Sequence, residues 1–521
     1  MFETLALKLS TLGLHLPALS LSRAVASVLC VPIIFFAGRG IFSLYFSPLR
    51  SIPGPWYASF SELWILVHTF RCRKVRAIDD LFKTYGPIVR IAPNTIAFLD
   101  QQTTRTIYNG MKLDKGPLYE AVHMNGHLHS VAIIEHSVHA KYRRIFSSHY
   151  TPGNMALLHP DMRASAQVLV EKIMEAKDRQ PLDIFPGIHL VMIDLILKST
   201  FGSHAGALDE WSEHSHNVIL SAIEDYGRLI LLSGITPGWI MAIVSRFPNE
   251  KWRKFCQSGD ILFNTMADLV RETEIARKEG RLEERDKPTL IQRFIAHNET
   301  CAPGDMLSFE DMVSESMTHL LAGVDASAVL TSYILWRFAS LPIDVKQKIQ
   351  AEMDFAMPNA SVIPPQNLLS TVAGLTGRLT GLRLHGPIPT FLERLAPRGE
   401  ALDILGYKLL PGTVIGTQSW SMHRDADVFP DPEAFDLERW LGDAEPQDAQ
   451  TQALAPFGLG SRVCVGQHLA RNAIKTMVAA IIRNFDVLPC EETNERTMEM
   501  MELFGMFPVG LSCKLEFQAR A

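Results

Sequence analysis

The sequence lacks both the paired cysteines of a disulfide framework and the excess of basic residues that nucleic-acid binding needs. Its seven cysteines are odd in number, widely scattered and without a Cys-x-x-Cys pair, so neither disulfides nor a structural zinc site is expected. The formal net charge of -6 offers no basic face, which excludes nucleic acid as a partner. A reducing, cytosol-facing environment fits these absences.

Linkers are also lacking. No low-complexity stretch or Gly/Ser run divides the 521 residues, and the sequence contains neither a phosphate-binding G-x-G-x-x-G loop nor a nucleophile elbow. With 47% hydrophobic and 20% charged residues, the chain can bury a large core. We therefore expect one large domain at residues 57–521, preceded by an N-terminal appendage.

The appendage is predicted to anchor the protein in a membrane. The apolar run from Ala24 to Phe46 is long enough to cross a hydrocarbon core about 30 Å thick. Pro32 and Arg39 leave open an amphipathic helix that lies in the interface instead. Basic residues crowd the C-terminal flank, so the large domain should face the cytosol, on the endoplasmic reticulum membrane. The expected segments are a lumenal or interfacial segment (1–22), a single transmembrane anchor (23–47) and a proline-rich hinge (48–56).

The longest predicted helix runs from Ser308 to Leu341. Ser308 and Asp311 have the spacing of a capping box, and Pro342 should stop the helix. At about 1.5 Å per residue, the helix would be roughly 50 Å long. Its charged residues exclude a membrane span, so it should cross a globular domain.

Shorter elements follow this helix. Apolar residues at helical spacing predict a second helix from Gly466 to Arg483. Residues 407–415 alternate like a short strand around Pro411 and Gly412, and residues 429–440 form an irregular, proline-punctuated stretch. The chain is therefore expected to be mainly α with small β-sheets.

The segment with the most chemical information is PFGLGSRVCVG, residues 456–466. Its glycines permit a tight loop close to a flat cofactor, and a helix N-terminus just beyond Cys464 favours the thiolate over the thiol. A thiolate on iron pushes electron density toward bound oxygen and favours O–O cleavage. Arg462 is suited to hold a cofactor carboxylate by a charge-assisted bond. A lone cysteine is more often a small buried hydrophobe, so the surrounding pattern must decide.

That pattern resembles the haem-binding signature F-x-x-G-x-R-x-C-x-G of the cytochrome P450 family. Ala322 to Asp325, AGVD, is similar to the family's oxygen-activating A-G-x-D, and residues 435–440, FDLERW, are similar to its F-x-P-E-R-W. The resemblance implies a cytochrome P450 fold, a single haem-binding domain with haem b (iron protoporphyrin IX) on the axial thiolate of Cys464. The signature is matched at Phe457, Gly460, Arg462, Cys464 and Gly466, and the resemblance implies that all five serve the cofactor.

Further cofactor contacts follow from the same resemblance. His139 and Arg143 are similar to the pair that holds a haem propionate in the family, and Arg394 lies where the family places another propionate-binding arginine. Each could instead be a solvated surface base.

The substrate pocket is expected around the long helix. Counting by three and four from Asp325 and Ala326 places Ala322, Leu321 and Thr318 on one helical stripe. The stripe is a packed core face, a pocket wall or both. The resemblance implies that three further residues complete the pocket, namely Ile388, Phe391 and Met506.

Two departures from the family put the chemistry in question. After Asp325 the family usually has a threonine whose hydroxyl helps to deliver protons, whereas this chain has Ala326 and then Ser327. Ser327 is rotated by about 100° from Ala326 on a regular helix. Asp325 and Ser327 are therefore the candidate catalytic residues, with a substrate hydroxyl, or Ser327 through water, completing the relay.

The second departure is a missing carboxylate. The family's E-x-x-R is here Thr380 to Arg383, so Arg383 and Arg439 lose the glutamate that pairs with them in the family. Removing one partner from a buried ionic network typically costs about 3 to 5 kcal/mol. Either another carboxylate has moved in or the core tolerates two poorly paired arginines. The glutamates nearby in sequence are Glu393, Glu400 and Glu438.

The function implied by the resemblance is that of a haem-thiolate monooxygenase for a hydrophobic small molecule. The segment HGPIPTFLERLAP, residues 385–397, resembles fungal enzymes of secondary-metabolite biosynthesis. Electrons from NADPH would arrive through NADPH–cytochrome P450 reductase, with cytochrome b5 as a further candidate partner, at a basic patch of Lys141, Arg144 and Lys475. The departures leave two alternatives, a haem-thiolate enzyme of isomerisation, cyclisation or dehydration, and a degenerate haem-binding member.

Overall fold

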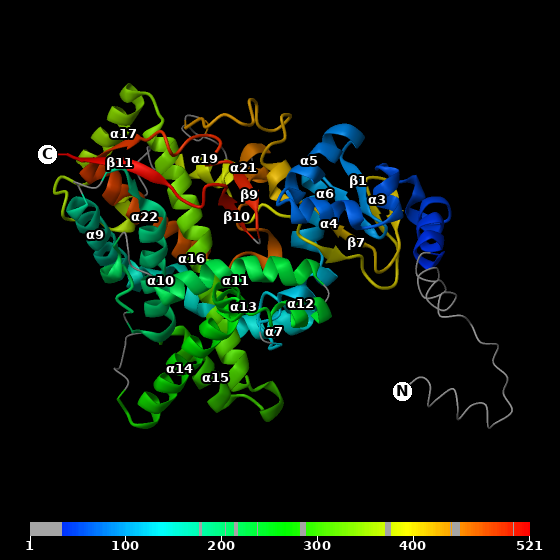
Figure 1. The fold of residues 1–521 in the computed structure, drawn as a ribbon, viewed down its shortest axis with the longest axis horizontal. Helices are drawn as coiled ribbons and strands as arrows, with labels where there is room; N and C mark the ends of the chain where they lie inside the picture. Colours follow the sequence, from blue (N-terminus) through cyan, green and yellow to red (C-terminus); the bar gives the residue numbers. More distant parts are fainter. Residues whose placement is uncertain are drawn as a thin grey trace.

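The protein is mainly helical with small sheets, as expected. A computed structural model describes residues 34–124, 126–176, 180–203, 205–212, 217–236, 238–281, 288–369, 377–437, 439, 449–503 and 505–520. Figure 1 shows helices α9, α10, α16 and α22 in one part of the molecule and the strands β1 and β7 with α3 to α6 in the other. The chain passes between the two parts several times, so they belong to one domain.

Helix α16 (Phe309–Ala339) confirms the prediction for the longest helix. The Asp311 N–H donates to Ser308 Oγ at 3.0 Å, and the Ser308 N–H donates to Asp311 Oδ2 at 3.3 Å, which completes the capping box. The helix ends at Ala339, three residues before Pro342, whose ring does not fit a helix interior. Helix α22 (Gln467–Asn484) likewise confirms the second predicted helix.

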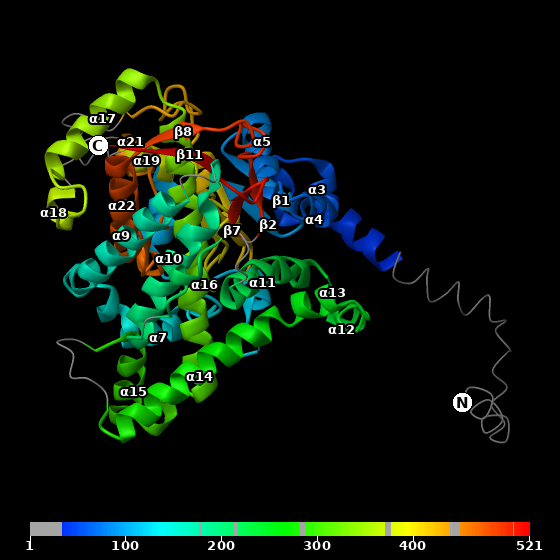
Figure 2. The same ribbon diagram turned by 60° about the vertical axis from the view of Figure 1, so that its left-hand side comes forward.

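The core of the helical part is built where α10 (Ile184–Phe201) packs along α16, as both views show (Figures 1 and 2). A Cβ on Gly323 would lie 2.6 Å from Ile196 Cδ1, so a larger residue here would require the Ile196 side chain to move. The other long helices are α4 (Leu63–Phe70), α5 (Lys74–Tyr85), α7 (His136–Phe146), α9 (His159–Glu175), α11 (Val218–Ile235), α14 (Ser258–Lys278), α15 (Leu290–Thr300), α17 (Ile343–Ala356) and α19 (Gly377–Leu384).

Short helices connect these elements. They are α3 (Trp56–Phe60), α6 (Gln101–Arg105), α8 (Pro152–Met155), α12 (Gly238–Val244), α13 (Glu250–Cys256), α18 (Gln366–Leu369), α20 (Ser419–Met422) and α21 (Ala449–Ala453). A single 3-10 turn, η10 (Gly460–Arg462), precedes Cys464.

The largest sheet among the described residues has the order β1 (Ile88–Ala92), β2 (Thr95–Phe98), β7 (Val414–Gly416) and β4 (Arg394–Leu395). Strand β7 runs parallel to β2, and the other neighbours are antiparallel. The remaining sheets are β3 (Leu182–Asp183), β11 (Lys514–Ala519) and β8 (Phe485–Pro489); β5 (Leu402–Ile404) and β6 (Tyr407–Leu409); and β9 (Met500–Glu502) and β10 (Met506–Pro508).

The single strand expected over residues 407–415 is two strands, β6 and β7, in different sheets. The chain turns between them at Gly412, whose φ of 82° is in the left-handed region that favours glycine. Pro411 has no N–H to donate to a neighbouring strand. The alternation of apolar and polar residues over 407–415 therefore includes a turn, and Pro411 and Gly412 are the residues that indicate it.

The predicted anchor lies largely outside the described residues, which begin at Ile34. An apolar helix, Ile34–Tyr45, is its described part, and buried Arg90 holds its end through Ser43 O at 3.0 Å. Two longer apolar stretches, Ile184–Phe201 and Pro303–Ala339, are long enough to span a membrane but are mostly buried, as core helices are. The anchor and its boundaries therefore remain predictions.

Candidate active site

The loop that carries Cys464 is closed by its own backbone. The Cys464 N–H donates to Phe457 O at 2.8 Å, and Gly458 and Gly460 have φ of 73° and 67°. A Cβ on Gly460 would lie 1.8 Å from Tyr108 O, so this position has room for hydrogen alone. The loop delivers Cys464 directly before α22, where the helix N-terminus favours a negative charge.

The Cys464 side chain is exposed although protein atoms surround it closely, so it faces an interior space rather than bulk water. Burial raises the pKa of the Cys464 thiol, and the Gly466 N–H and the guanidinium groups of Arg143 and Arg471 oppose this shift only in part. A metal ion on the sulfur would lower the pKa of the thiol instead, because a thiol that coordinates a metal loses its proton.

Five basic side chains gather beside this loop, and none of them forms an ion pair within the described part of the chain. Arg462 donates to Ile133 O and Ile134 O, both at 2.7 Å, and Arg143 donates to Val463 O at 2.7 Å. These partners are backbone carbonyls, which carry no charge. The five residues are Lys115, His139, Arg143, Arg394 and Arg462.

The crowding of these cations has a large electrostatic effect. Burial and the charges of Arg462 and Arg394 lower the pKa of Lys115 to about 6. Burial, with Arg462 and Lys115, lowers the pKa of His139 to about 3, and burial with Arg394 lowers that of Arg462 to about 10. Such a cluster is suited to bind anionic groups, which would stabilise the charged forms.

Lys115 is a basic residue that the sequence analysis missed. Its side chain is buried, Nζ donates to Val131 O at 2.6 Å, and it lies 4.2 Å from the Tyr119 ring. A backbone bridge between Lys115 and Arg394 places the two side by side. No local pattern distinguishes this lysine from a surface lysine, because its neighbours come from distant parts of the sequence.

The predicted pocket stripe is accessible in the middle of α16. Ala322 is exposed and Ala326 half-buried, although most residues of this helix are buried. The Asp325 side chain is 20% exposed and lies 3.4 Å from His189 Nε2. Ser327 is 2% exposed, and its hydroxyl has no hydrogen-bond partner among the described residues. The structure therefore brings Ala322, Asp325 and Ala326 together and places Ser327 on the packed side.

The remaining predicted pocket residues differ in exposure, and two of them lie in adjoining segments, because the Met506 N–H donates to Pro387 O at 2.8 Å beside Ile388. Leu321 is half-buried against the main core, and buried Thr318 donates to Ser314 O at 2.8 Å. Ile388 is exposed, and Met506 is buried in the main core. Phe391 packs in a separate cluster beside the large sheet.

Arg383, which lacks the family's glutamate, is held by uncharged groups. It donates to His423 O at 2.8 Å, Pro432 O and Ala434 O, and its guanidinium lies 5.0 Å from the Phe429 ring centre. Burial, together with the charges of Arg439 and Arg424, lowers its pKa to about 10. Three carbonyls and an aromatic face thus surround the guanidinium in place of the family's glutamate, which agrees with the alternative of a poorly paired arginine.

None of the three glutamates considered from the sequence is seen to pair with Arg383. Glu393 accepts the Leu118 N–H at 3.3 Å, Glu400 is exposed, and Glu438 and the side chain of Thr380 lie outside the described residues. A different carboxylate, Glu433, pairs with the neighbouring Arg424 at 3.0 Å.

The comparisons with known proteins complete these observations. The family model described as Cytochrome P450 matches residues 55–515. The chain belongs to the cytochrome P450 family.

Among its relatives is the cytochrome P450 monooxygenase stcB of Emericella nidulans, 26% identical over 84% of this chain and 82% of the relative. Averantin hydroxylase of Aspergillus parasiticus is 27% identical over 86% of this chain and 87% of the relative. Tryprostatin B 6-hydroxylase of Aspergillus fumigatus is 26% identical over 87% and 77%. The chain is a monooxygenase of the cytochrome P450 family.

The family implies a haem with a cysteine thiolate ligand, and the residues of this P450 fit that group. Cys464 presents its sulfur to an interior space, and Arg462 keeps a buried Nε without a hydrogen-bond partner among the described residues. The two propionates of a haem would match the neighbouring cluster of basic side chains, because a bound anion would stabilise their charged forms. The predicted cofactor contacts Phe457, Gly460 and Gly466 all belong to the same loop.

The proposed reductase patch needs one correction. Lys141 and Arg144 are exposed on α7, but Lys475 on α22 is buried. The prediction that Lys475 belongs to an exposed patch is wrong, because apolar spacing places it on the packed face of its helix.

Proposed function

We propose that this P450 uses molecular oxygen and electrons from NADPH, passed on by NADPH–cytochrome P450 reductase, to hydroxylate a hydrophobic small molecule of a secondary-metabolite pathway. The relatives named as hydroxylases support this reaction type. The single observation that carries the proposal is the enclosed but accessible sulfur of Cys464 beside a cluster of basic side chains that form no ion pair among the described residues.

The proposed roles of the residues follow from their positions. Cys464 ligates the haem iron, and when bound the haem supplies oxygen activation. Lys115, His139, Arg394 and Arg462 hold its propionates, while Arg143 stays close to the cysteine loop through Val463 O. Small side chains at Ala322 and Ala326 leave room for an apolar substrate next to Asp325.

The proposal is tested with the full chain, a purified reductase and cell extracts that contain or lack the chain. We expect a thiolate-type absorption band when the reduced protein binds carbon monoxide, and a metabolite that gains oxygen from labelled O2 only with NADPH. Turnover without NADPH would instead show isomerase or dehydratase chemistry. Absence of the thiolate band would show a degenerate member.

We also propose that the protein is attached to the endoplasmic reticulum membrane by a single pass with its catalytic domain in the cytosol, where cytochrome b5 is a second electron donor. Among the exposed apolar side chains are groups on three segments, and grouped apolar residues are more informative than single ones. The groups include Phe35, Phe36 and Phe42 near the N-terminus, Trp56 and Phe70 on or beside α3 and α4, and Trp239, Ile243 and Phe247 on or beside α12.

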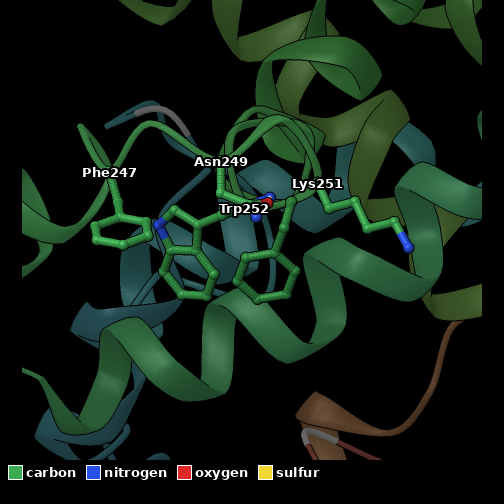
Figure 3. A pocket seen from close by; sticks show the side chains of 5 residues that line it. Phe247, Asn249, Lys251 and Trp252 are labelled. Carbon is green, nitrogen blue, oxygen red and sulfur yellow. The ribbon is translucent and has the colours of Figure 1, made fainter.

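The third of these segments borders an aromatic pocket of about 440 Å³ (Figure 3). Trp252 and Phe255 stack in it with ring centres 5.1 Å apart, beside Phe247 and the charged Lys251. Aromatic rings next to a lysine are typical of the membrane–water interface. We expect the full chain to remain with membranes after an alkaline carbonate wash, and its release would contradict an integral anchor.

A further inference from the structure

His189 is a buried histidine that no sequence motif marks, and it lies against the acid of the distal helix. Its side chain is 1% exposed, and its Nε2 atom is 3.4 Å from Asp325 Oδ1. The two atoms are at ion-pair distance, and neither has a hydrogen-bond partner among the described residues. An imidazole with an unused nitrogen at a carboxylate is costly to bury unless the two share a proton.

The orientation of the ring fixes which nitrogen faces Asp325. His189 Nδ1 lies 2.7 Å from Phe185 O, and because a carbonyl only accepts, Nδ1 must donate there. The Phe185 ring packs edge-on against the imidazole with centres 4.4 Å apart. Nε2 therefore carries a hydrogen only in the imidazolium form, and that hydrogen would lie toward Asp325.

The charges around His189 favour the imidazolium. Burial lowers the pKa of His189, but Asp325, the Phe185 carbonyl and Glu224 outweigh it, and the pKa is raised above its usual value. Asp183, at the N-terminal end of α10, also interacts with His189, and Arg228 interacts with Glu224. Glu224, on α11, is exposed although protein surrounds it, which places it at an interior surface.

The same stretch of α16 lacks the hydroxyl that family members place after the acid. Ala326 has no proton to give, and Ser327 is buried on the packed side of the helix. Neither of the two residues that follow Asp325 in α16 therefore offers it an accessible alcohol, while a protonatable side chain, His189, lies against it.

We propose that His189 is a positioning residue that holds the Asp325 carboxylate and stores the proton that Asp325 delivers to the distal side of the haem site. This rests on the proposed monooxygenase function. The Nε2 proton passes to Asp325 Oδ1, and Asp325 releases one proton toward the reacting oxygen. A hydronium ion of the solvent then gives its proton to Asp325, the accessible member of the pair, which passes it back to Nε2 and leaves neutral water. Both residues return to their starting states, and neither gains or loses electrons.

The first test measures the pair without turnover. Exchange of the imidazole C2 hydrogen for deuterium, followed by mass spectrometry at a series of pH values, gives the titration midpoint of each histidine in the full chain. We expect His189 to titrate above 6.5 in the wild type and at lower pH in Asp325→Asn. His149 is a matched control, since it is equally buried but its Nε2 lies 2.8 Å from Ser199 Oγ. An unchanged His189 midpoint in Asp325→Asn would overturn the proposal.

The second test measures oxygen reduction with a purified reductase, NADPH and no added substrate. His189→Gln keeps an amide donor near the Nε2 position but cannot ionise, so we expect NADPH oxidation to fall at least about tenfold and to lose its dependence on pH near neutrality. We expect His149→Gln to retain the wild-type rate and profile. A wild-type rate and pH profile in His189→Gln would contradict the storage role.

A rescue variant separates this role from a structural one. Introducing Ala326→Thr restores the missing hydroxyl, so it should recover NADPH oxidation in His189→Gln but not in Asp325→Asn. Failure to rescue His189→Gln, with its carbon monoxide band intact, would refute the inference alone. Lack of that band in the wild type would instead refute the proposed function.

Discussion

The loop before Cys464 offers a pair of glycines that separates backbone strain from steric contact. Gly458 and Gly460 have similar φ, 73° and 67°. A Cβ on Gly458 would meet nothing within 4 Å, whereas a Cβ on Gly460 would lie 1.8 Å from Tyr108 O and 2.7 Å from Tyr108 C. Both Gly458→Ala and Gly460→Ala therefore place an alanine in the left-handed region. Only Gly460→Ala also brings its Cβ into collision with the Tyr108 backbone.

Tyr108 is poorly placed to move away. Its hydroxyl donates to Leu392 O and accepts the Thr417 N–H at 3.1 Å, and its side chain is buried. Left-handed backbone costs an alanine about 1 to 2 kcal/mol, which is the full expected effect at Gly458. Overpacking adds about 1 to 3 kcal/mol, so Gly460→Ala should lose roughly 2 to 5 kcal/mol in total.

Two measurements distinguish the variants, the midpoint of thermal unfolding and the haem content per polypeptide. We expect Gly458→Ala to keep its haem with a slightly lower midpoint, and Gly460→Ala to lose haem as well as stability, because the loop that carries Cys464 must shift. Equal losses in the two variants would show that contact with Tyr108 does not determine the loop.

The remaining predictions concern charge, proton delivery and the missing glutamate. In the haem-free chain Lys115 has a pKa of about 6, below its unfolded value, so between these values the folded state binds fewer protons and the lysine costs stability. Lys115→Met should raise the unfolding midpoint of the haem-free chain at pH 7, with a gain that shrinks as pH rises, but should weaken haem retention; a lower midpoint at pH 7 would contradict the cation crowding. Ser327→Ala should leave NADPH oxidation and peroxide release unchanged, since its hydroxyl is buried, and a large change would place Ser327 in the relay. Arg383→Met should destabilise the protein by about 3 kcal/mol or more in chemical denaturation, because three carbonyls lose their donor, whereas Glu433→Gln should cost under about 1 kcal/mol as an exposed partner; similar losses would mean that Glu433 is the replacement carboxylate.

Local signals explain which parts of the fold the sequence could predict. Helix α16 begins at a capping box and ends before a proline, both readable within a few residues. The Cys464 loop is equally local, with its ligand, glycines and Arg462 in one short segment. The prediction of a single strand over residues 407–415 was wrong, because alternation with a period of two does not show which sheet a strand joins.

Long-range contacts explain the rest. Lys115 joins the cationic cluster through a bridge to Arg394, and His189 reaches Asp325 from another helix. The two terminal nitrogens of Arg383 donate to carbonyls, which every residue carries, so a search for a replacement carboxylate could not have found these partners. The roles of these residues depend on contacts between segments that are far apart in the sequence.

The central claim is that the sulfur of Cys464 ligates haem iron. The most direct measurement is the absorption spectrum of reduced, carbon monoxide-treated Cys464→Ser beside the wild type, with total haem determined separately. We expect the thiolate-type band in the wild type and its loss in Cys464→Ser. An unchanged band in Cys464→Ser would contradict the assignment.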